Sequence, residues 1–430
     1  MSSRVRAVNM GALLWSCRLW LLYALAYLWR RLLFRTTFIA ITGSVGKTTA
    51  KECLAAILST QFSTASTLNN QNDRYGVPRT ILRVRPWHRF AVIEAGTVGP
   101  GLIRRSARLV RPHLAIVLTV ARNHTRSFSS LEETAAEKAS LLDAVPRSGL
   151  AILNAEDPNV RLMASNRRCR VNTFGTSAGQ DLWADEVSSS WPETLTLRAH
   201  TRSEVEWVKT KLVGRHWVSS VLAGIAGALA CGVPLKAAAA AVANVEPFPA
   251  RMQPIILPNG ATLIRDEYNG SYHTWQAALN VLRDAQAARR VLVMSDVSDW
   301  VKSSTRSMRT RDRNMEMGRI AARMADVAIF VSEHARHAVK AAVAAGMNPD
   351  NVTGFTNLLT AAEHLKSELR HGDLVLLRGR GADHLSRICF AQFGEIGCWK
   401  TRCAKTIVCD HCDELRPGFD LQIITRGARD

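Results

Sequence analysis

Apolar positions form one long run near the start of the chain and a series of short runs after it. The long run extends from Met10 to Trp29, contains a single charge, Arg18, and has about the length that spans a bilayer. An arginine near the middle of a spanning helix costs roughly 2.5–3.5 kcal/mol, so a helix lying in the membrane interface competes closely with a spanning one. The run predicts a membrane-associated helix within residues 1–36. A buried helix of the first domain is the alternative.

The short runs predict strands that alternate with helices. In residues 37–248 the segments Thr37–Thr42, Leu114–Val120 and Leu150–Asn154 have the length and composition of buried strands. The alanine-rich stretch Ala223–Ala243 predicts two helices. This alternation is typical of an α/β domain with a parallel sheet.

A second set of apolar runs lies in residues 249–393, at Arg290–Met294, Val327–Val331 and Leu374–Leu377. Helical stretches separate these runs, so the region predicts a smaller, Rossmann-like α/β domain. Residues 394–430 form a tail, which we expect to be frayed and polar from Asp413 onward.

Composition narrows the class of partner. Hydrophobic residues make up 47% of the 430 positions and charged residues 21%, which argues against disorder and against a membrane protein of many spans. Lys and Arg outnumber Asp and Glu by 56 to 36, for a formal charge of +20. The partners are therefore expected to be anionic, namely nucleotide phosphates, nucleic acid or an acidic membrane surface.

A phosphate-binding loop is expected directly after the first short strand, at Gly43-Ser44-Val45-Gly46-Lys47-Thr48-Thr49. Glycines let backbone N–H groups approach phosphate, and the N-terminus of the following helix adds positive potential. A lysine reaches the outer phosphates, and a hydroxyl binds Mg²⁺. Ile41 stands where the strict G-x-x-x-x-G-K-[ST] pattern has its first glycine, and a chance Gly-Lys-Thr turn is the alternative.

The shorter form of this loop, T-G-S-x-G-K-T-T, resembles that of the Mur ligases, the ATP-dependent amide ligases of peptidoglycan assembly. Asn69-Asn70 and Gly76-Val77-Pro78 resemble the N-N-x-x-G-V-P segment of MurF-type members, with two extra residues between the halves. The strand Ala91–Gly96 resembles the one that ends in E-x-G. The resemblance spans roughly residues 38–392 and implies a P-loop central domain followed by a Mur-type C-terminal domain.

Metal-binding residues are expected beside the loop. Thr48 and Glu94 supply the hard oxygen ligands that Mg²⁺ prefers. The resemblance adds His124 and Lys138, which lie fourteen residues apart, and implies that carbon dioxide carbamylates the lysine and so makes it an anion. A capping box that begins at Ser130 starts the helix carrying Lys138. The alternative for Lys138 is an exposed helix lysine in a surface ion pair.

Further nucleotide contacts are implied by the resemblance. Gly214-Arg215-His216 resembles the family's G-x-H-N-x-x-N segment near the adenine, but Trp217 and Ser220 replace both asparagines, which leaves nucleotide affinity open. Arg251 matches an arginine that reaches the γ-phosphate, and Asp266 matches an acidic residue that contacts the nucleotide. Each would otherwise be a surface residue. The implied catalytic set is Lys47, Lys138, His124 and Arg251.

The amine donor is expected to differ from the usual one. Asp296 ends a strand that resembles the family's V-x-G-D-M segment, whereas Arg378-Gly379-Arg380 stands where the family has K-G-S. Because that region helps to bind the amino substrate in MurF-type members, Arg378 and Arg380 suggest a different donor. A basic surface turn is the alternative.

The tail carries a second candidate metal site. Cys398, Cys403, Cys409 and Cys412 give the spacing C-x4-C-x5-C-x2-C, which predicts a tetrahedral structural Zn²⁺ site. Disulfides and an iron-sulfur cluster are the alternatives, and disulfides are disfavoured in a reducing cytoplasm.

Together these features predict an ATP-dependent ligase that joins a carboxylate acceptor to an amino-acid or peptide donor through an acyl phosphate. The family's UDP-binding N-terminal domain is expected to be absent, and the layout of an anchor followed by a Mur-type ATPase resembles the poly-γ-glutamate synthetase subunit. Arg30, Arg31 and Arg35 follow the apolar run, so we expect the enzyme at the cytoplasmic face of the inner membrane, against anionic lipid.

Two other functions stay open at this point. One is a nucleotide-binding membrane subunit that is not catalytic by itself and needs a second subunit. The other, ranked last, is a nucleic-acid-dependent ATPase. Few aromatic residues interleave with basic runs, so no nucleic-acid partner is expected.

Overall fold

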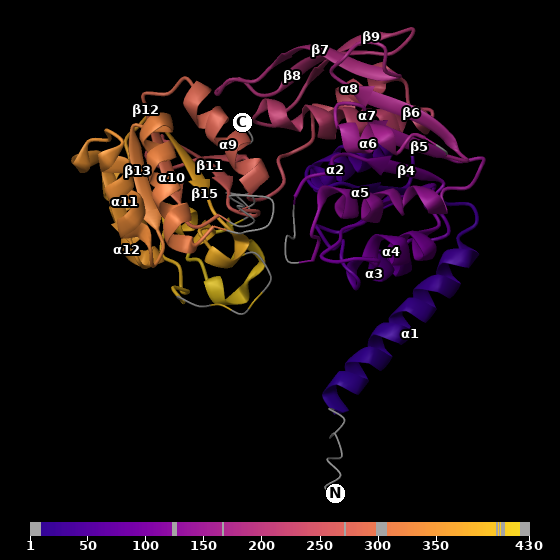
Figure 1. Ribbon diagram of the computed structural model, residues 1–430, viewed down its shortest axis with the longest axis horizontal. Helices are drawn as coiled ribbons and strands as arrows, with labels where there is room; N and C mark the ends of the chain where they lie inside the picture. The colour runs from indigo at the N-terminus through magenta and orange to yellow at the C-terminus, as the bar shows by residue number, and fades with distance from the viewer. Residues whose placement is uncertain are drawn as a thin grey trace, which may run out of the picture. The chain divides into compact units, whose positions relative to one another are not determined.

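The computed structural model describes residues 10–122, 127–165, 167–270, 272–297, 308–400, 403, 405 and 409–421. The chain forms two compact units (Figure 1). Unit 1 comprises residues 1–185, 198–208 and 219–242, and unit 2 comprises residues 186–197, 209–218 and 243–430. The segment boundaries expected from the sequence stay predictions.

Unit 1 contains most of a nine-stranded sheet with the order β2-β3-β1-β4-β5-β6-β7-β8-β9. The pairs from β2 to β7 are parallel, which confirms the predicted α/β class. The strands are β1 Thr37–Thr42, β2 Thr64–Ser66, β3 Phe90–Glu94, β4 Leu114–Val117, β5 Leu150–Asn154, β6 Arg170–Gly175, β7 Leu182–Ser188, β8 Thr196–His200 and β9 Val205–Lys209.

Helices cover the central parallel strands β1, β3, β4 and β5, whose side chains are buried on both faces. One face packs against α3, α4 and α6 through residues such as Val77, Ile103 and Val160. On the other, α7 approaches α2 closely, because a Cβ atom at Gly224 would lie 2.7 Å from the Cβ of Cys53. The helices are α2 Lys47–Ser59, α3 Gly76–Arg83, α4 Leu102–Val110, α5 Leu131–Ala139, α6 Pro158–Leu162, α7 Val218–Ala230 and α8 Leu235–Val242.

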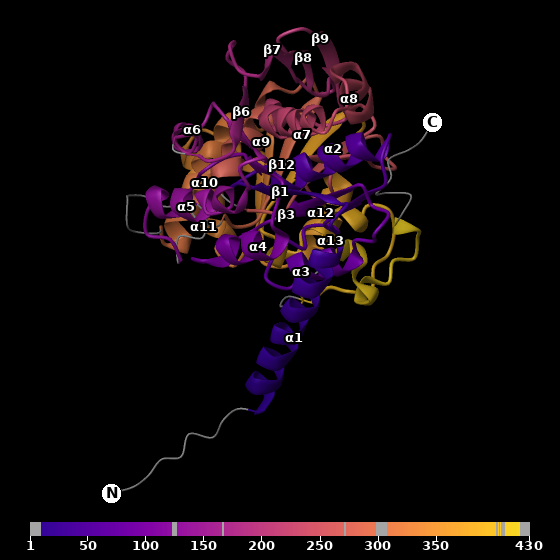
Figure 2. The same cartoon turned by 90° about the vertical axis from the view of Figure 1, so that its right-hand side faces the viewer.

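The long apolar run forms the helix α1 (Met10–Leu32), which projects from unit 1 in both views (Figures 1 and 2). Its last turns are tied to the unit: the Trp29 indole N–H donates to the Val84 carbonyl at 2.8 Å, and Arg30 donates to the carbonyls of Val110 and Arg111. Among the described helices, none combines the length and the apolar character needed to cross a membrane.

Unit 2 is built on a six-stranded sheet with the order β10-β11-β15-β12-β13-β14, in which only β10 runs antiparallel to its neighbour. The predicted second α/β domain is thus confirmed. The strands are β10 Gln253–Ile256, β11 Thr262–Asp266, β12 Arg289–Met294, β13 Val327–Val331, β14 Val352–Phe355 and β15 Asp373–Arg378. The helices are α9 Tyr272–Asp284, α10 Thr310–Met324, α11 Ala335–Ala344, α12 Leu358–Glu368 and α13 Ser386–Phe390.

The tail packs against this sheet. Ile396, Cys409 and Leu415 are buried in the same apolar cluster as the strands, and Leu415 is only 1% exposed. Asp410 accepts two hydrogen bonds, at 2.7 and 2.9 Å, from the buried guanidinium of Arg265 on β11. The expectation that the chain frays from Asp413 onward is therefore wrong for Asp413–Leu415, which form a short 3₁₀ turn.

Candidate active site

The phosphate loop joins β1 to α2, as the sequence predicts. Gly46 caps α2 with φ +83°, a left-handed backbone conformation that residues other than glycine rarely adopt. The loop is held by the segment after β4, since the Ser44 N–H donates to the Thr119 carbonyl at 2.8 Å and the Val45 N–H donates to the Thr119 hydroxyl at 3.1 Å. Lys47 opens the helix, and its Nζ donates back to the Gly43 carbonyl at 2.8 Å. The loop is thus ordered in a conformation that places a helix N-terminus behind it, and Thr49 lies in the first turn of that helix.

Ser220, in place of a family asparagine, supports this loop. Its hydroxyl donates to the Gly46 carbonyl at 3.2 Å. A Cβ atom at Gly46 would lie 2.5 Å from the hydroxyl oxygen of Ser220. The contact joins α7 to the loop across 174 residues of chain. Sequence reasoning recorded Ser220 only as a departure from the family pattern, and no local signal points to this role.

Thr48 and Glu94, which the sequence predicts as Mg²⁺ ligands, are in contact with each other. The Thr48 hydroxyl donates to Oε1 of Glu94 at 3.2 Å, and both residues are buried. Asn72, which sequence reasoning missed, donates from its amide to the same oxygen at 2.6 Å. Oε2 of Glu94 is buried without a hydrogen-bond partner among the described residues. Because a buried carboxylate oxygen needs a partner, this orphaned atom beside a threonine hydroxyl fits a hard cation such as Mg²⁺.

Lys138 lies near the end of α5 and is only 3% exposed, so the alternative of a surface lysine is wrong. Burial, reinforced by the charge of Lys47, lowers the pKa of its ammonium from 10.5 to about 7, while Glu137 opposes the shift. The Ser130 hydroxyl caps α5 by accepting from the Glu133 N–H at 3.2 Å, which confirms the predicted helix start. A largely neutral amine is the form that reacts with carbon dioxide, so the lowered pKa fits the expected carbamylation. His124 lies outside the described residues.

In unit 2, Arg251 and Asp266 lie close to aromatic and basic partners. The Arg251 guanidinium stacks 4.7 Å from the Tyr268 ring centre. Asp266 forms a buried ion pair with Arg378 and accepts from the Met252 N–H at 3.2 Å. Burial raises the pKa of Asp266 from 3.8 to about 6, although Arg378 opposes the rise. Asp266 is therefore held by a residue that the sequence placed in the donor region.

His216 lies in a short turn that precedes α7, half-buried against the ring of Trp217 at 4.6 Å between centres. Burial, with a contribution from Arg378, lowers the pKa of His216 to about 4. The imidazole is therefore neutral at physiological pH and can donate or accept a hydrogen bond. Its role toward a nucleotide stays a prediction.

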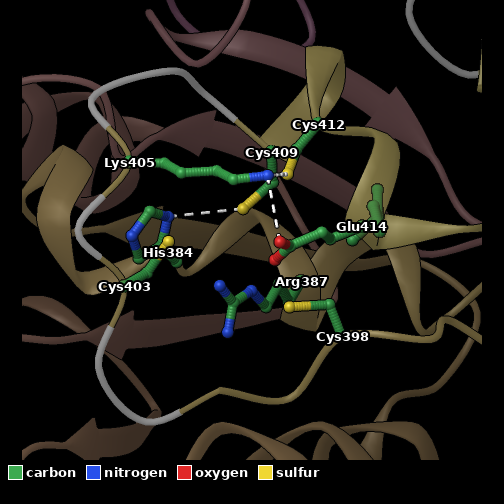
Figure 3. A pocket seen from close by; sticks show the side chains of 9 residues that line it. His384, Arg387, Cys398, Cys403, Lys405, Cys409, Cys412 and Glu414 are labelled. Carbon is green, nitrogen blue, oxygen red and sulfur yellow. Dashed lines mark hydrogen bonds and ion pairs between the residues drawn. The ribbon is translucent and has the colours of Figure 1, made fainter.

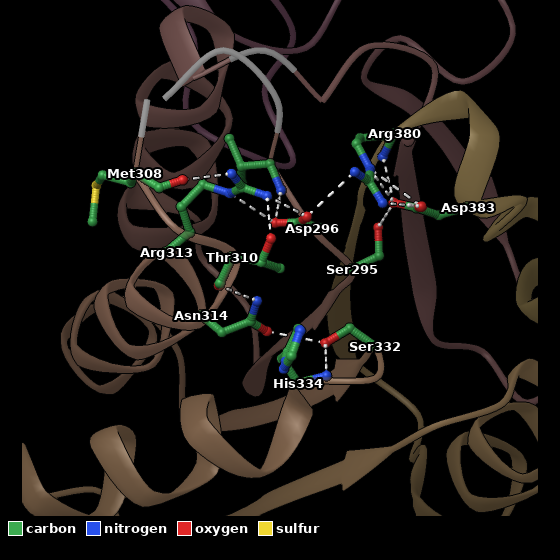
Figure 4. A network of polar contacts seen from close by, with 11 residues as sticks. Ser295, Asp296, Met308, Thr310, Arg313, Asn314, Ser332, His334, Arg380 and Asp383 are labelled. Atoms are coloured by element: carbon green, nitrogen blue, oxygen red, sulfur yellow. Dashed lines mark hydrogen bonds and ion pairs between the residues drawn. The ribbon is translucent and has the colours of Figure 1, made fainter. Parts of the chain in front are cut away.

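The expected donor region is a polar network at the carboxyl ends of the strands of unit 2 (Figure 4). Asp296, just after β12, pairs with Arg313 at 2.7 Å and with Arg380 at 3.2 Å. Arg380 also pairs with Asp383, and its side chain is 38% exposed. Arg378 is only 2% exposed, so a basic surface turn is wrong for that residue. Ligands of open α/β sheets bind at this edge.

Four cysteines and a histidine line a small pocket in unit 2 (Figure 3). Sγ of Cys409 lies 3.4 Å from Nδ1 of His384, and Nζ of Lys405 lies 3.4 Å from Sγ of Cys412. Cys398 and Cys403 complete the predicted set. Over the described part of the chain, however, no three His, Cys, Asp or Glu side chains are arranged as the ligands of one metal ion. His384 was not recognised from the sequence, since it precedes the tail.

Comparison with known proteins identifies the domains. Residues 41–228 match the Mur ligase middle domain, and residues 250–381 match the glutamate ligase domain of the same family. The chain belongs to the Mur ligase family. The MurF-type resemblance is confirmed by a UDP-N-acetylmuramoyl-tripeptide–D-alanyl-D-alanine ligase of Escherichia coli, which is 34% identical over 63% of this chain and 60% of its own length.

Other Mur ligases match over longer segments. The corresponding enzyme of Mycobacterium bovis is 29% identical over 85% of this chain and 74% of its own length. Among solved structures, MurF of Acinetobacter baumannii superimposes with a TM-score of 0.78 at 25% identity, covering 86% of this chain and 79% of that one. MurF of Thermotoga maritima, solved with ADP, shows the same fold with a TM-score of 0.73 at 20% identity, over 90% and 84% of the two chains. The chain thus spans about three fifths to four fifths of the length of these relatives.

Proposed function

We propose that this Mur ligase is an ATP-dependent enzyme that activates a substrate carboxylate as an acyl phosphate and joins it to an amine. The observation that carries the proposal is the buried pair of Thr48 and Glu94, with its orphaned carboxylate oxygen, next to an ordered phosphate loop. Buried Lys138, whose pKa is depressed partly by Lys47 of that loop, adds a reactive amine to the same site. These are the parts that phosphoryl transfer to a carboxylate requires.

The proposed reaction proceeds in two steps. A carboxylate oxygen of the acceptor attacks the γ-phosphorus of ATP, and ADP leaves. The donor amine then attacks the acyl carbon, the tetrahedral intermediate loses phosphate, and the nitrogen loses a proton to give the amide. Phosphorylation is needed because a free carboxylate is a poor electrophile.

The residues of the chain have distinct roles in the first step. Backbone N–H groups of the loop bind the phosphates, and Lys47 offsets charge on the transferred phosphoryl group. The family resemblance gives Arg251 a role of the same kind. Thr48 and Glu94 would hold Mg²⁺, which polarises phosphoryl oxygens when bound. By family resemblance, carbamylated Lys138 and His124 would hold a second ion. Carbamylation forms a bond between Nζ and the carbon of carbon dioxide and releases one proton.

The donor proposed for this enzyme is an amino acid or short peptide with a free carboxylate. The relatives are named for joining D-alanyl-D-alanine to a UDP-muramoyl-tripeptide. Arg380 supports the proposal, because its guanidinium, which pairs with Asp296 and Asp383, is partly exposed at the carboxyl edge of the sheet in unit 2. Arg378 is committed to Asp266 and is not assigned to the donor.

We propose that the tail binds structural Zn²⁺. Four thiols and the imidazole of His384 that line one pocket support this proposal. Elemental analysis of the purified protein should find about one zinc per chain, and Cys398→Ser combined with Cys412→Ser should lose it. Retention of zinc in that double variant would contradict the assignment.

The ligase proposal is tested by ADP release. Purified protein is assayed with carboxylate acceptors, including UDP-muramoyl-tripeptide and lipid-linked acids, and with amino-acid and dipeptide donors. Turnover should require both an acid and an amine and should be lost in Lys47→Ala and Lys138→Ala. Lys236→Ala, an exposed lysine on α8, is the matched control and should be unaffected. ATP binding without turnover for any pair would refute catalysis by this chain alone.

That last outcome would favour the second candidate, a nucleotide-binding subunit that depends on a partner. The replacement of two family asparagines by Trp217 and Ser220 supports this candidate. The two functions are separated by adding a lysate of the source cells, since a partner-dependent subunit would then turn over ATP in a manner that still requires Lys47.

A further inference from the structure

The helix α1 presents a continuous leucine stripe to solvent. Leu21, Leu25, Leu28 and Leu32 are spaced by four, three and four residues, which places them on one face of a helix. Their side chains are 53%, 49%, 60% and 64% exposed. Ala26 and Leu33, which face the other way, are buried in unit 1. The unit therefore covers one side of α1 and leaves an apolar stripe on the other, and such exposed patches mark interaction sites.

A basic cavity lies at the C-terminal end of the same helix. Its volume is about 320 Å³, and its lining includes Arg30, Arg31, Arg111, His113 and the exposed ring of Phe34. Among the described residues, no carboxylate lines this cavity. Three guanidinium groups therefore gather in the described part of its wall without an acidic partner there, which favours an anion with several oxygen atoms.

Two details show that this cavity is preformed. Arg30 is only 7% exposed and is fixed by hydrogen bonds of 2.6 and 2.9 Å to the carbonyls of Val110 and Arg111. Nδ1 of His113 accepts from the Phe38 N–H at 3.0 Å, so the proton of the neutral ring lies on Nε2, which is then a donor. The side chains need little reorganisation to bind an anion.

We propose that α1 and this cavity together dock the enzyme on the surface of an anionic phospholipid bilayer. The leucine stripe enters the boundary of the acyl chains, and the cavity receives a lipid phosphate. Charge supports a lipid surface over a second copy of the chain: α1 has three arginines and no acidic residue, so pairing two stripes would bring like charges together. Apolar contact and attraction to anionic headgroups act together in such helices.

The test is co-sedimentation of the full chain with vesicles of phosphatidylcholine, with or without phosphatidylglycerol. Binding should require phosphatidylglycerol and weaken with salt. Leu25→Asp with Leu28→Asp should reduce it at least tenfold, and Arg31→Gln should reduce it about fivefold, the effect of one basic residue near a charged surface. Ile256→Asp on β10, 66% exposed, and Arg202→Gln, with a side chain 90% exposed, are the matched controls and should bind like the wild type.

The proposal does not depend on catalysis, because binding is measured without substrates. Circular dichroism checks that each variant is folded, which is expected because every changed side chain is exposed to solvent. Absence of binding to anionic vesicles would overturn the proposal. So would equal binding to neutral vesicles, or light scattering that finds a dimer which the leucine variant separates.

Discussion

Replacing Lys138 by methionine should make the metal-free protein more stable at neutral pH and should remove a pH dependence. Methionine fills a similar volume without a charge. In the unfolded chain the lysine holds its proton up to about pH 10.5, whereas burial lowers the folded pKa to about 7. Between these values the unfolded state binds more protons, so the stability of the wild type rises with pH. From pH 7.5 to 9.5 the rise in unfolding free energy from this residue is about 2.5 kcal/mol, at roughly 1.4 kcal/mol per pH unit for one proton.

The assay is chemical unfolding of wild type and Lys138→Met across this pH range, in buffer with a chelator and depleted of carbon dioxide. The difference in unfolding free energy between the two proteins isolates Lys138, because other titrating groups are shared. The variant should be the more stable protein at pH 7.5, and its advantage should shrink by about 2.5 kcal/mol between pH 7.5 and pH 9.5. A difference that stays constant with pH would refute the depressed pKa. In a second experiment, ¹³C-labelled bicarbonate should give a carbamate signal by NMR in the wild type and none in the variant.

Three further predictions follow from the two units. Gly46→Ala should weaken ATP binding in calorimetry and destabilise unit 1 by about 1–2 kcal/mol because of its positive φ. The control Gly101→Ala, with φ +79° but open space around its Cβ position, should show the backbone cost alone. Equal nucleotide affinities in the two variants would contradict a role for the Ser220 contact. Asp410→Asn should destabilise unit 2 in thermal unfolding by about 1–3 kcal/mol, because it removes one of the two buried carboxylates, Asp410 and Glu267, that pair with Arg265. The exposed Asp413→Asn should change little. Asp266, with a pKa raised to about 6, takes up its proton as pH falls through 6, while the carboxyl of the unfolded chain stays charged down to about 3.8, so its contribution to stability increases on acidification. The difference in unfolding free energy between wild type and Asp266→Asn should therefore grow in favour of the wild type from pH 7 to pH 5. The opposite slope would contradict the raised pKa.

Local patterns predicted several elements of unit 1, including the strand before the phosphate loop. The bounds of β1 and β5, the capping serine of α5 and the break between α7 and α8 all follow from periodicity, a capping box and turn-forming residues. The burial of Lys138 was expected only through family resemblance, since a lysine on a helix is exposed more often than not.

The contacts that tune the site could not be predicted in this way. The amide of Asn72 on Glu94 and the hydroxyl of Ser220 on Gly46 join residues that are 22 and 174 positions apart. Neither pair leaves a trace in hydrophobic period or local spacing. The same holds for Arg378, which looks like a surface cation in sequence but is buried because Asp266 lies opposite it on the neighbouring strand.

The ion pair between Arg265 and Asp410 bears on how much of the chain is needed for unit 2 to fold. The similarity to the family's glutamate ligase domain ends at residue 381, yet the apolar cluster of this unit extends to Phe390 and Leu415. A fragment cut at the family boundary would expose that cluster and leave the fully buried guanidinium of Arg265 with only one of its two carboxylate partners, Glu267. The smallest soluble piece of the C-terminal half should therefore include the cysteine-rich tail, so expression trials guided by homology alone would yield an aggregating fragment.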